Sequence, residues 1–437
     1  MSAPHISKMF LYNLFPTLAG KFGQWNTHIN RAADMGFNWI FLNPIQMPGI
    51  SGSLYSIKDY YSFNPLLTDA GNCIPPEEQL IEIMETAGSR GINMMIDLVI
   101  NHTAIDSPLT KEHPGWFLHD NKGRIEHPYA MDGGRKVVWG DLARLDYNEG
   151  PQADELYEYF RDLVKHLMKL GFSGFRCDAA YQIPQAVWKR LISEIKSSCP
   201  DTVFAAETLG CSREQTAETA RAGFDYIFNS SKWWDFKSPW LMEQYEIFRE
   251  ICPSISFPES HDTERLAHEY KGDINALKRA YLFAAFFSTG VMIPMGFEFG
   301  FSNRLHVVDT RPEDWESTDM DLTGFISEVN AIKAAHNIFK TEASTETIEH
   351  AGDKNIFLLA KKSSNETALV AINMDLNTEN TFSLKDLSCT LHLGGRPLTC
   401  SRPGAGPEEA SDVKSYTLAP GDGIIFNMET VSVTEGN

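Results

Sequence analysis

Short apolar runs alternate with longer helical patterns along the first two thirds of the chain. Each run ends in polar residues, and the segments between them repeat apolar side chains at helical spacing, as in residues 77–90 and 154–170. Strands that alternate with helices in this way predict βαβ units and a parallel sheet. The predicted strands are residues 9–14, 39–42, 94–100, 172–177, 203–206, 226–228, 255–257 and 291–294.

About eight such units predict an α/β fold, a closed (β/α)8 barrel. An open Rossmann-like sheet is the structural alternative, but the first run is not followed by the glycine-rich turn typical of that fold. In a barrel, the polar residues that follow the strands would meet at one mouth, where this fold carries its chemistry.

Two regions depart from the alternation. Residues 103–150 have no clear helical pattern, and a connection of this length is usually functional. Its aromatic residues argue against a disordered insertion. The end of the chain has short β-like runs, among them residues 390–393, whereas residues 402–411 are rich in Gly, Pro and Glu and predict a mobile loop. We therefore predict a barrel from residues 1–102 and 151–338, an excursion subdomain from 103–150, and a C-terminal β-sandwich from 339–437.

Composition and charge restrict the partners. The chain has 437 residues, 43% hydrophobic and 22% charged, which is typical of a folded protein. Its net charge of -20 argues against nucleic acid and anionic membrane surfaces as partners. The seven cysteines are scattered, no signal peptide is visible, and no stretch approaches the roughly 18 apolar residues of a membrane span. We expect a cytoplasmic protein with reduced thiols, and the oligomeric state stays open.

The fourth predicted strand ends in an arginine and an aspartate two residues apart, Arg176 and Asp178. Side chains at this spacing on a strand point to the same face, so the arginine can lie beside the carboxylate and favour its ionised form. A structural ion pair at a strand end is the alternative when these two residues are considered alone.

Three carboxylates follow predicted strands four, five and seven: Asp178, Glu207 and Asp262. Two carboxylates that flank a glycosidic bond are the usual groups for its hydrolysis. Asp178, with the arginine beside it, suits the ionised nucleophile, and Glu207, after an apolar run and near other carboxylates, suits the protonated acid. Asp262 would bind sugar hydroxyls, and we expect His102 and His261 to donate hydrogen bonds to the same sugar. Taken alone, each of these groups could be structural.

Four short segments contain these candidate residues. Residues 97–102 read DLVINH, and residues 174–180 read GFRCDAA. The segment around Glu207 reads AET, and the one that ends in Asp262 reads SHD. In this order the segments resemble the four signature blocks of the α-amylase family (glycoside hydrolase family 13), of which the first two are D-x-x-x-N-H and G-F-R-x-D-A-A. The family also has an excursion after strand three and a C-terminal β-domain. The resemblance implies a retaining mechanism in which Asp178 is the nucleophile, Glu207 the acid/base and Asp262 the transition-state stabiliser.

The resemblance extends to substrate binding. Tyr55 is similar to a tyrosine that stacks on the sugar, although Leu54 stands where the family often has glycine, and ordinary packing is the alternative. After strand six, Lys232, Trp233 and Trp234 could form acceptor subsites or pack the loop against the barrel. The expected substrate-binding residues are Tyr55, Asp97, His102, Arg176, Lys232, Trp233 and His261.

No cofactor is required by these motifs. Asn101 resembles a calcium ligand of many family members, and Asp146 is a candidate partner. Calcium prefers six or more oxygen ligands, so two candidates leave its binding open.

The resemblance implies a retaining glycoside hydrolase or transglycosylase that acts on α-1,4-linked glucans or maltooligosaccharides. The alternative is a glucanotransferase or maltosyltransferase with little hydrolysis, because the same carboxylates serve both reactions. A non-catalytic carbohydrate-binding or scaffold member would have lost a catalytic carboxylate, and all three are present. An unrelated barrel enzyme, such as an aldolase or a sugar-phosphate isomerase, would need a Schiff-base lysine or a phosphate-gripping loop, and neither is clear.

Overall fold

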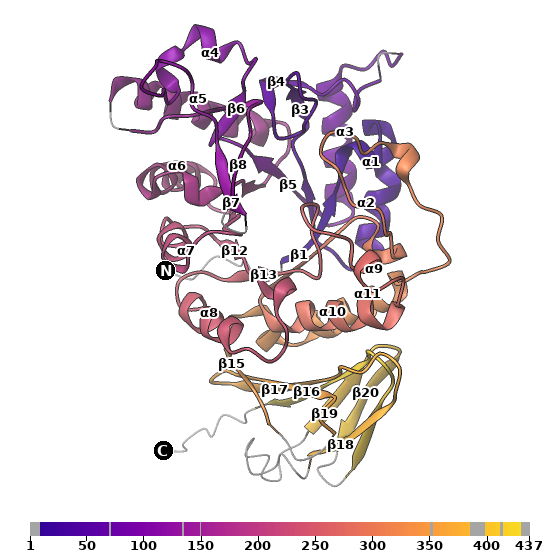
Figure 1. Cartoon of the computed structure of the whole chain (residues 1–437). Coiled ribbons are helices and arrows are strands. Elements are labelled where there is room, and N and C mark those ends of the chain that lie inside the picture. The colour runs from indigo at the N-terminus through magenta and orange to yellow at the C-terminus, as the bar shows by residue number, and fades with distance from the viewer. Residues whose placement is uncertain are drawn as a thin grey trace, which may run out of the picture.

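The eight predicted strands form one closed parallel barrel. The structure is a computed structural model, and it describes residues 9–69, 71–132, 135–148, 150–349, 353–384, 398–410 and 414–429. Each strand of the barrel pairs with its neighbours in parallel register, and the ring closes between the first strand and the last (Figure 1). The strands are β1 (Met9–Leu14), β2 (Trp39–Leu42), β5 (Asn93–Leu98), β10 (Gly174–Cys177), β11 (Val203–Ala206), β12 (Tyr226–Phe228), β13 (Ser254–Ser256) and β14 (Gly290–Pro294). The (β/α)8 prediction is confirmed.

Helices surround the barrel and bury one apolar face against the outside of the strands. Because alternate strand residues point to opposite faces, Met9 and Leu11 of β1 fill the barrel interior, whereas Phe10 and Tyr12 pack outward in the helix–strand core. The surrounding helices include α2 (Trp25–Asp34), α3 (Pro76–Ser89), α5 (Pro151–Lys169), α6 (Gln185–Ser198), α7 (Arg213–Ala220), α8 (Trp240–Phe248), α10 (Ile274–Phe287) and α11 (Thr323–Ala335).

Two hairpin-like insertions lie above the mouth of the barrel. The chain between β2 and α3 forms the antiparallel pair β3 (Gln46–Pro48) and β4 (Ile57–Phe63). The long connection after β5 forms a small subdomain, seen at the upper left of Figure 1. It contains the pairs β6 (His102–Ala104) with β9 (Leu142–Arg144) and β7 (Tyr129–Asp132) with β8 (Arg135–Val138), and the short helix α4 (Leu109–Glu112).

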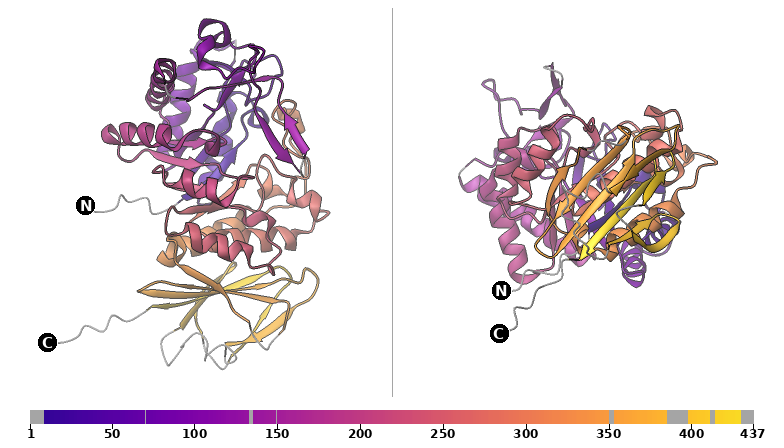
Figure 2. Two further views of the ribbon diagram at one scale, coloured as in Figure 1. Left: turned by 60° about the vertical axis from the view of Figure 1, so that its left-hand side comes forward. Right: turned by 90° about the horizontal axis from the view of Figure 1, so that it is seen from below.

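The C-terminal part is antiparallel β structure that packs beneath the barrel, on the side away from the excursion (Figure 2). A two-stranded sheet, β18 (Asn380–Ser383) with β21 (Ser415–Leu418), accompanies a six-stranded sheet. In spatial order the larger sheet holds β15 (Ser344–Thr347), β16 (Ile356–Lys362), β17 (Glu366–Asn373), β22 (Gly423–Glu429), β19 (Leu398–Arg402) and β20 (Ala405–Ala410). The domain boundaries that we assigned from the sequence stay a prediction.

One expectation for this domain is wrong. Residues 402–411 do not form a mobile loop, because most of the segment is the hairpin between β19 and β20. Gly404 supplies the positive φ of the turn. Pro407 has no N–H to donate, and it is tolerated in β20 because this strand lies at the edge of its sheet. The predicted strand at residues 390–393 lies outside the described residues.

Among the described residues, no helix combines the length and the apolar character needed to cross a membrane. The six cysteines that the structure describes are all free thiols.

Candidate active site

Adjacent strands of the barrel hold Asp178 and Glu207 side by side. The backbone N–H of Glu207 donates to the carbonyl of Cys177, which continues the β10–β11 pairing past the strand ends. The carboxylate of Glu207 then accepts the N–H of Ala179 at 2.9 Å and the N–H of Leu209 at 2.5 Å. Ala179 has φ 40° and ψ 47°, a left-handed conformation that is unfavourable for a residue with a side chain. This strained residue follows Asp178 in the chain and donates its N–H to Glu207, so it connects the two carboxyl groups.

Arg176 lies beneath the mouth and binds two carboxylates. Its Nη1 donates to Asp178 Oδ1 at 2.8 Å, as the spacing on the strand predicted, and to Asp97 Oδ1 at 2.8 Å. Asp97 is 1% exposed, and burial raises its pKa to about 6 despite the charge of Arg176. The hydroxyl of Tyr55 donates to the other oxygen of Asp97 at 2.5 Å. Asp97 therefore contacts Arg176 and Tyr55 in the floor of the site.

The environments of two carboxyl groups drive their pKa values apart. Burial, helped by the nearby Asp178, raises the pKa of Glu207 to about 7 although Arg176 acts in the opposite direction. Desolvation by the surrounding walls of the mouth would raise the pKa of Asp262, although its side chain is 59% exposed, but the His261 imidazole beside it lowers that pKa to about 2. At neutral pH, Glu207 can hold a proton while Asp262 stays ionised, which is the usual division between an acid and a charge stabiliser.

The two histidines contact Tyr55. The ring of Tyr55 lies parallel to that of His261 with centroids 5.8 Å apart, and the Tyr55 hydroxyl is 2.7 Å from His261 Nε2. His102 directs its Nε2 at the backbone carbonyl of Tyr55, 3.0 Å away, and must donate there because a carbonyl only accepts. Burial lowers the pKa of His102, so the remaining nitrogen, Nδ1, is an acceptor in the neutral ring. In this arrangement, the donor that we expected to face a sugar binds the backbone instead.

These side chains meet a cavity of about 460 Å³ at the mouth of the barrel. The polar part of its lining contains Asp178, Glu207, Asp262, Tyr55 and His102. The remaining lining residues, of which only Asn101 was predicted as a site residue (as a calcium ligand), include a mostly apolar group from the excursion and from the segment after β14. They are Ser53, Asn101, Pro128, Trp139, Asp141, Leu142, Ala179, Tyr181, Gln182, Val307 and Val308.

Trp139 stands out in this second group because its side chain is 40% exposed and follows directly after β8. Its N–H donates to the carbonyl of Pro128, and its carbonyl accepts the N–H of Leu142, which fixes its backbone. An exposed indole beside polar groups suits the apolar face of a sugar ring. The aromatic content of residues 103–150 was the available signal in the sequence, but it did not single out Trp139.

The tryptophan loop after β12 lies elsewhere. Lys232 pairs with both carboxylate oxygens of Glu269 at 3.2 Å, and Trp234 is 6% exposed and packs against neighbouring aromatic rings. Trp233 is 52% exposed and contacts Phe257 edge to face. Lys232 and Trp233 are absent from the described lining of the mouth cavity, so their role in substrate binding stays a prediction.

Calcium binding also stays a prediction. Asn101 Oδ1 is buried without a hydrogen-bond partner, which would suit a hard cation. The candidate partner, Asp146, uses one oxygen to accept the N–H of Asn148. Within the described ranges, no three His, Cys, Asp or Glu side chains come together as a metal site. One orphan oxygen does not define a calcium site.

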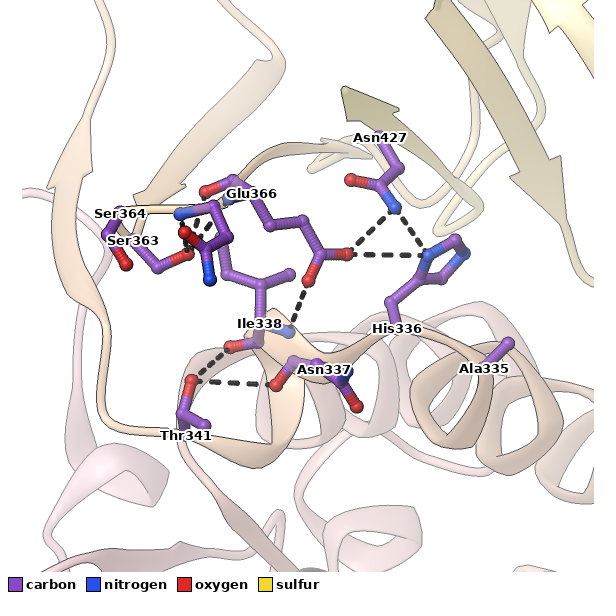
Figure 3. A pocket seen from close by; sticks show the side chains of 10 residues that line it. Ala335, His336, Asn337, Ile338, Thr341, Ser363, Ser364, Glu366 and Asn427 are labelled. Carbon is purple, nitrogen blue, oxygen red and sulfur yellow. Dashed lines mark hydrogen bonds and ion pairs between the residues drawn. The ribbon is translucent and has the colours of Figure 1, made fainter. Parts of the chain in front are cut away.

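A second cavity of about 460 Å³ lies at the junction between the barrel and the C-terminal domain (Figure 3). Glu366 accepts the N–H of Ile338 at 2.9 Å and the amide of Asn427 at 2.8 Å, and His336 Nδ1 is 2.6 Å from the same amide. Glu366 is the one carboxylate in its described lining. The mouth cavity, whose lining contains the four carboxylates of Asp141, Asp178, Glu207 and Asp262, is the better candidate for an active site.

Comparisons with known proteins agree with this geometry. Residues 5–122 match the family described as glycogen debranching enzyme, glucanotransferase domain. An α-1,4-glucan:maltose-1-phosphate maltosyltransferase from Burkholderia pseudomallei is 26% identical over 380 residues, which cover 84% of this chain and 33% of that protein. A cyclomaltodextrin glucanotransferase from a Bacillus species is 22% identical over an alignment of 481 positions, gaps included, that covers 94% of this chain and 63% of that protein.

A solved structure gives the same fold. The crystal structure of an α-amylase from Lactobacillus plantarum has a TM-score of 0.73 at 21% identity, covering 96% of this chain and 98% of that one. The fold and the site define a (β/α)8 barrel of the amylase type. Together with the four sequence blocks, the matched family and the relatives support a member of the α-amylase family, glycoside hydrolase family 13. It spans about a third of the length of the maltosyltransferase that it matches.

Proposed function

We propose that the chain is a retaining enzyme that cleaves α-1,4-linked glucans or maltooligosaccharides, as a glycoside hydrolase or a transglycosylase. The observation that supports this most directly is the pair formed by Asp178 and Glu207. Glu207 is buried with a pKa of about 7, and it accepts the N–H of Ala179, the residue that follows Asp178. A carboxyl group with a raised pKa, held beside a second carboxylate that contacts an arginine, matches the two roles of a retaining mechanism.

In the first step, Asp178 attacks the anomeric carbon while Glu207 gives its proton to the departing glycosidic oxygen. The C–O bond to the leaving sugar breaks, and a glycosyl-aspartate ester forms. Arg176 holds Asp178 Oδ1 at 2.8 Å and so orients the nucleophile. In the second step, Glu207 takes a proton from an acceptor hydroxyl, whose oxygen attacks the anomeric carbon and frees Asp178. The ionised Asp262 would stabilise the positive charge that develops on the sugar in both steps.

Transfer to a second sugar is the second candidate, with little hydrolysis. Trp139 and the valines at 307 and 308 give the cavity an apolar side that favours a sugar acceptor over water. Two of the relatives reported above are named as transferases.

Product analysis of the purified chain with maltooligosaccharides of defined length tests the proposal. Products longer than the substrate mean transfer, and shorter products alone mean hydrolysis. Asp178→Asn should lower turnover by about 10³-fold or more, because the covalent step loses its nucleophile. The control is Asp154→Asn, in an exposed ion pair on α5, which should keep full activity. No turnover by the wild-type chain on glucans or activated glycosyl donors would overturn the proposal and favour a non-catalytic member.

A further inference from the structure

The loop that carries Asp262 depends on its backbone to place the carboxylate. The Asp262 side chain is 59% exposed, and the one close side-chain partner recorded in the described structure is His261 Nε2 at 3.1 Å. A carboxylate with so few contacts of its own takes its position from the chain on either side. Any device that fixes this backbone also fixes Asp262 relative to the other two carboxylates.

A buried ion pair closes this loop at its two ends. Glu259 and Arg265 are each 1% exposed, and Arg265 Nη1 donates to Glu259 Oε1 at 2.8 Å. The second carboxylate oxygen of Glu259 accepts the N–H of Leu266 at 2.5 Å. The segment between the two charged residues is short and contains His261 and Asp262. The ion pair therefore joins the start of the loop to its end.

The same arginine also binds the segment that follows β14. Arg265 Nη2 donates to the carbonyl of Met295 at 2.9 Å, and its Nε donates to the carbonyl of Asn303 at 3.2 Å. From that segment, Arg304 Nη2 donates back to the carbonyl of Asp262 at 2.9 Å. The planar guanidinium thus holds the ends of strands seven and eight in one arrangement around Asp262.

Stability alone gives a poor account of two charges in this position. The desolvation of a buried ion pair often offsets its Coulomb attraction, and apolar side chains of similar volume often serve the fold equally well. Neither Glu259 nor Arg265 is in the described lining of the mouth cavity. They can act on the reaction only by setting the position of the loop between them.

We propose that the buried pair of Glu259 and Arg265 is a positioning device that holds Asp262 in place at the mouth of the barrel. The inference rests on the proposed function, because it takes Asp262 as the third carboxylate of the reaction. It assigns a role in turnover to two residues that do not touch the substrate.

The test replaces both charges at once with apolar side chains, Glu259→Leu with Arg265→Met, in the full chain. If the pair positions Asp262, kcat on maltooligosaccharides should fall by about 10- to 100-fold, because a displaced catalytic group loses much of its effect. KM should stay within about twofold, since the substrate contacts remain. The melting temperature reports whether the fold survives.

The matched control is Lys361→Met, which removes a buried charge at the opposite end of the barrel. It should change the melting temperature and leave kcat unaltered. If the double variant folds and keeps kcat within about twofold of wild type, the pair is a stability element and the proposal is wrong.

A second variant covers the case in which the double variant does not fold. Glu259→Gln keeps the shape of the side chain and an oxygen for Leu266 N–H. The alkaline limb of the kcat/KM profile of this variant should shift, because displacement of the Asp262 charge changes the pKa of Glu207. A purely structural role of the ion pair would leave that limb in place. Failure of both variants to fold would reject the proposal. Inactivity of the wild-type chain would instead reject the proposed function, so the two failures are distinct.

Discussion

Charged side chains are buried at both ends of the barrel, but they are satisfied in different ways. At the lower end, Lys333 Nζ donates to the carbonyls of Ala285, Ser288 and Phe339 at 2.6 to 2.7 Å. The three carbonyls favour the charged form of this amine, whereas burial lowers its pKa. Lys361 of β16 binds the carbonyl of Phe287 in the same region and ties the C-terminal domain to α10.

The mouth has more carboxylates than cations. Arg176 serves both Asp97 and Asp178, and Glu207 and Asp262 share the same space without a cation of their own in the described lining. At the lower end the buried lysines are hydrogen-bonded to backbone carbonyls, whereas at the mouth carboxylates face a cavity and can gain or lose a proton during a reaction. Burial of charge alone therefore does not identify an active site. An excess of one sign that faces a cavity is the better mark.

Among the comparisons of the two ends, replacement of Glu207, the proposed acid, should give the largest effect. Glu207→Gln should lower kcat on maltooligosaccharides by about 10²- to 10⁴-fold, because the leaving oxygen no longer receives a proton. Glycosides whose leaving group departs as a stable anion, such as a nitrophenyl maltoside, should lose much less, since they need no proton. Steady-state kinetics on both substrates measure the difference. Equal losses on the two would contradict the acid role of Glu207.

The pH profile should separate the two ends of the molecule. Glu207 must carry a proton to act as acid, so kcat/KM should fall as pH rises through about 7 and drop about tenfold per unit above it. The lower end does not take part in this step, and Lys361→Met should show the same alkaline limb as wild type. A flat profile between about pH 6 and about pH 9 would mean that Glu207 is not the titrating acid.

Two exposed tryptophans test how far the apolar side of the mouth matters. Trp139→Ala should raise KM for maltooligosaccharides about fivefold, the equivalent of roughly 1 kcal/mol of ring contact. Trp233→Ala is the matched control, because its ring is more exposed but lies outside the described cavity lining. Initial-rate measurements with both variants show which tryptophan contributes more to substrate binding. A larger effect at Trp233 would support the acceptor subsite that the sequence analysis suggested for the loop after β12.

The tryptophans also show where prediction from the sequence ends. Asp178 and Glu207 were predictable because strand periodicity and barrel geometry together bring strand ends to one mouth. That Trp139 and not Trp233 lines the mouth cavity could not be predicted, since it depends on how the loops after β8 and β12 fold back. The hairpin at residues 398–410 was missed because a glycine- and proline-rich composition also suits an edge strand with a tight turn.

The contacts beneath the mouth were equally out of reach. Arg176 was predicted beside Asp178, but its second partner, Asp97, lies on a neighbouring strand, and the pairing register brings the two together. The Nε2 of His102 faces the carbonyl of Tyr55, a contact between the start of β6 and the loop that joins β3 to β4. Residue types and spacing indicate which side chains reach the mouth, whereas the direction of each hydrogen bond follows from packing.

The smallest effect is expected at the lower end, where rising pH should increase the free energy of unfolding, whereas at the mouth it should decrease turnover. Burial lowers the pKa of Lys361 from 10.5 to about 8, so between these values the unfolded chain holds a proton that the folded chain has lost. Folding is then favoured by rising pH. The free energy of unfolding of wild type, measured against Lys361→Met by urea denaturation, should increase by about 1 kcal/mol between about pH 7 and about pH 9. Burial, and to a lesser extent the charge of Lys361, lowers the pKa of Lys333, so the measured difference reports the two neighbouring lysines together. A difference that shrinks over this range would mean that the carbonyl of Phe287 stabilises the charged lysine enough to outweigh its burial, and the lower end would then titrate like an ordinary salt-bridged site. With the expected sign, the same rise in pH lowers turnover at the mouth while it strengthens the junction below.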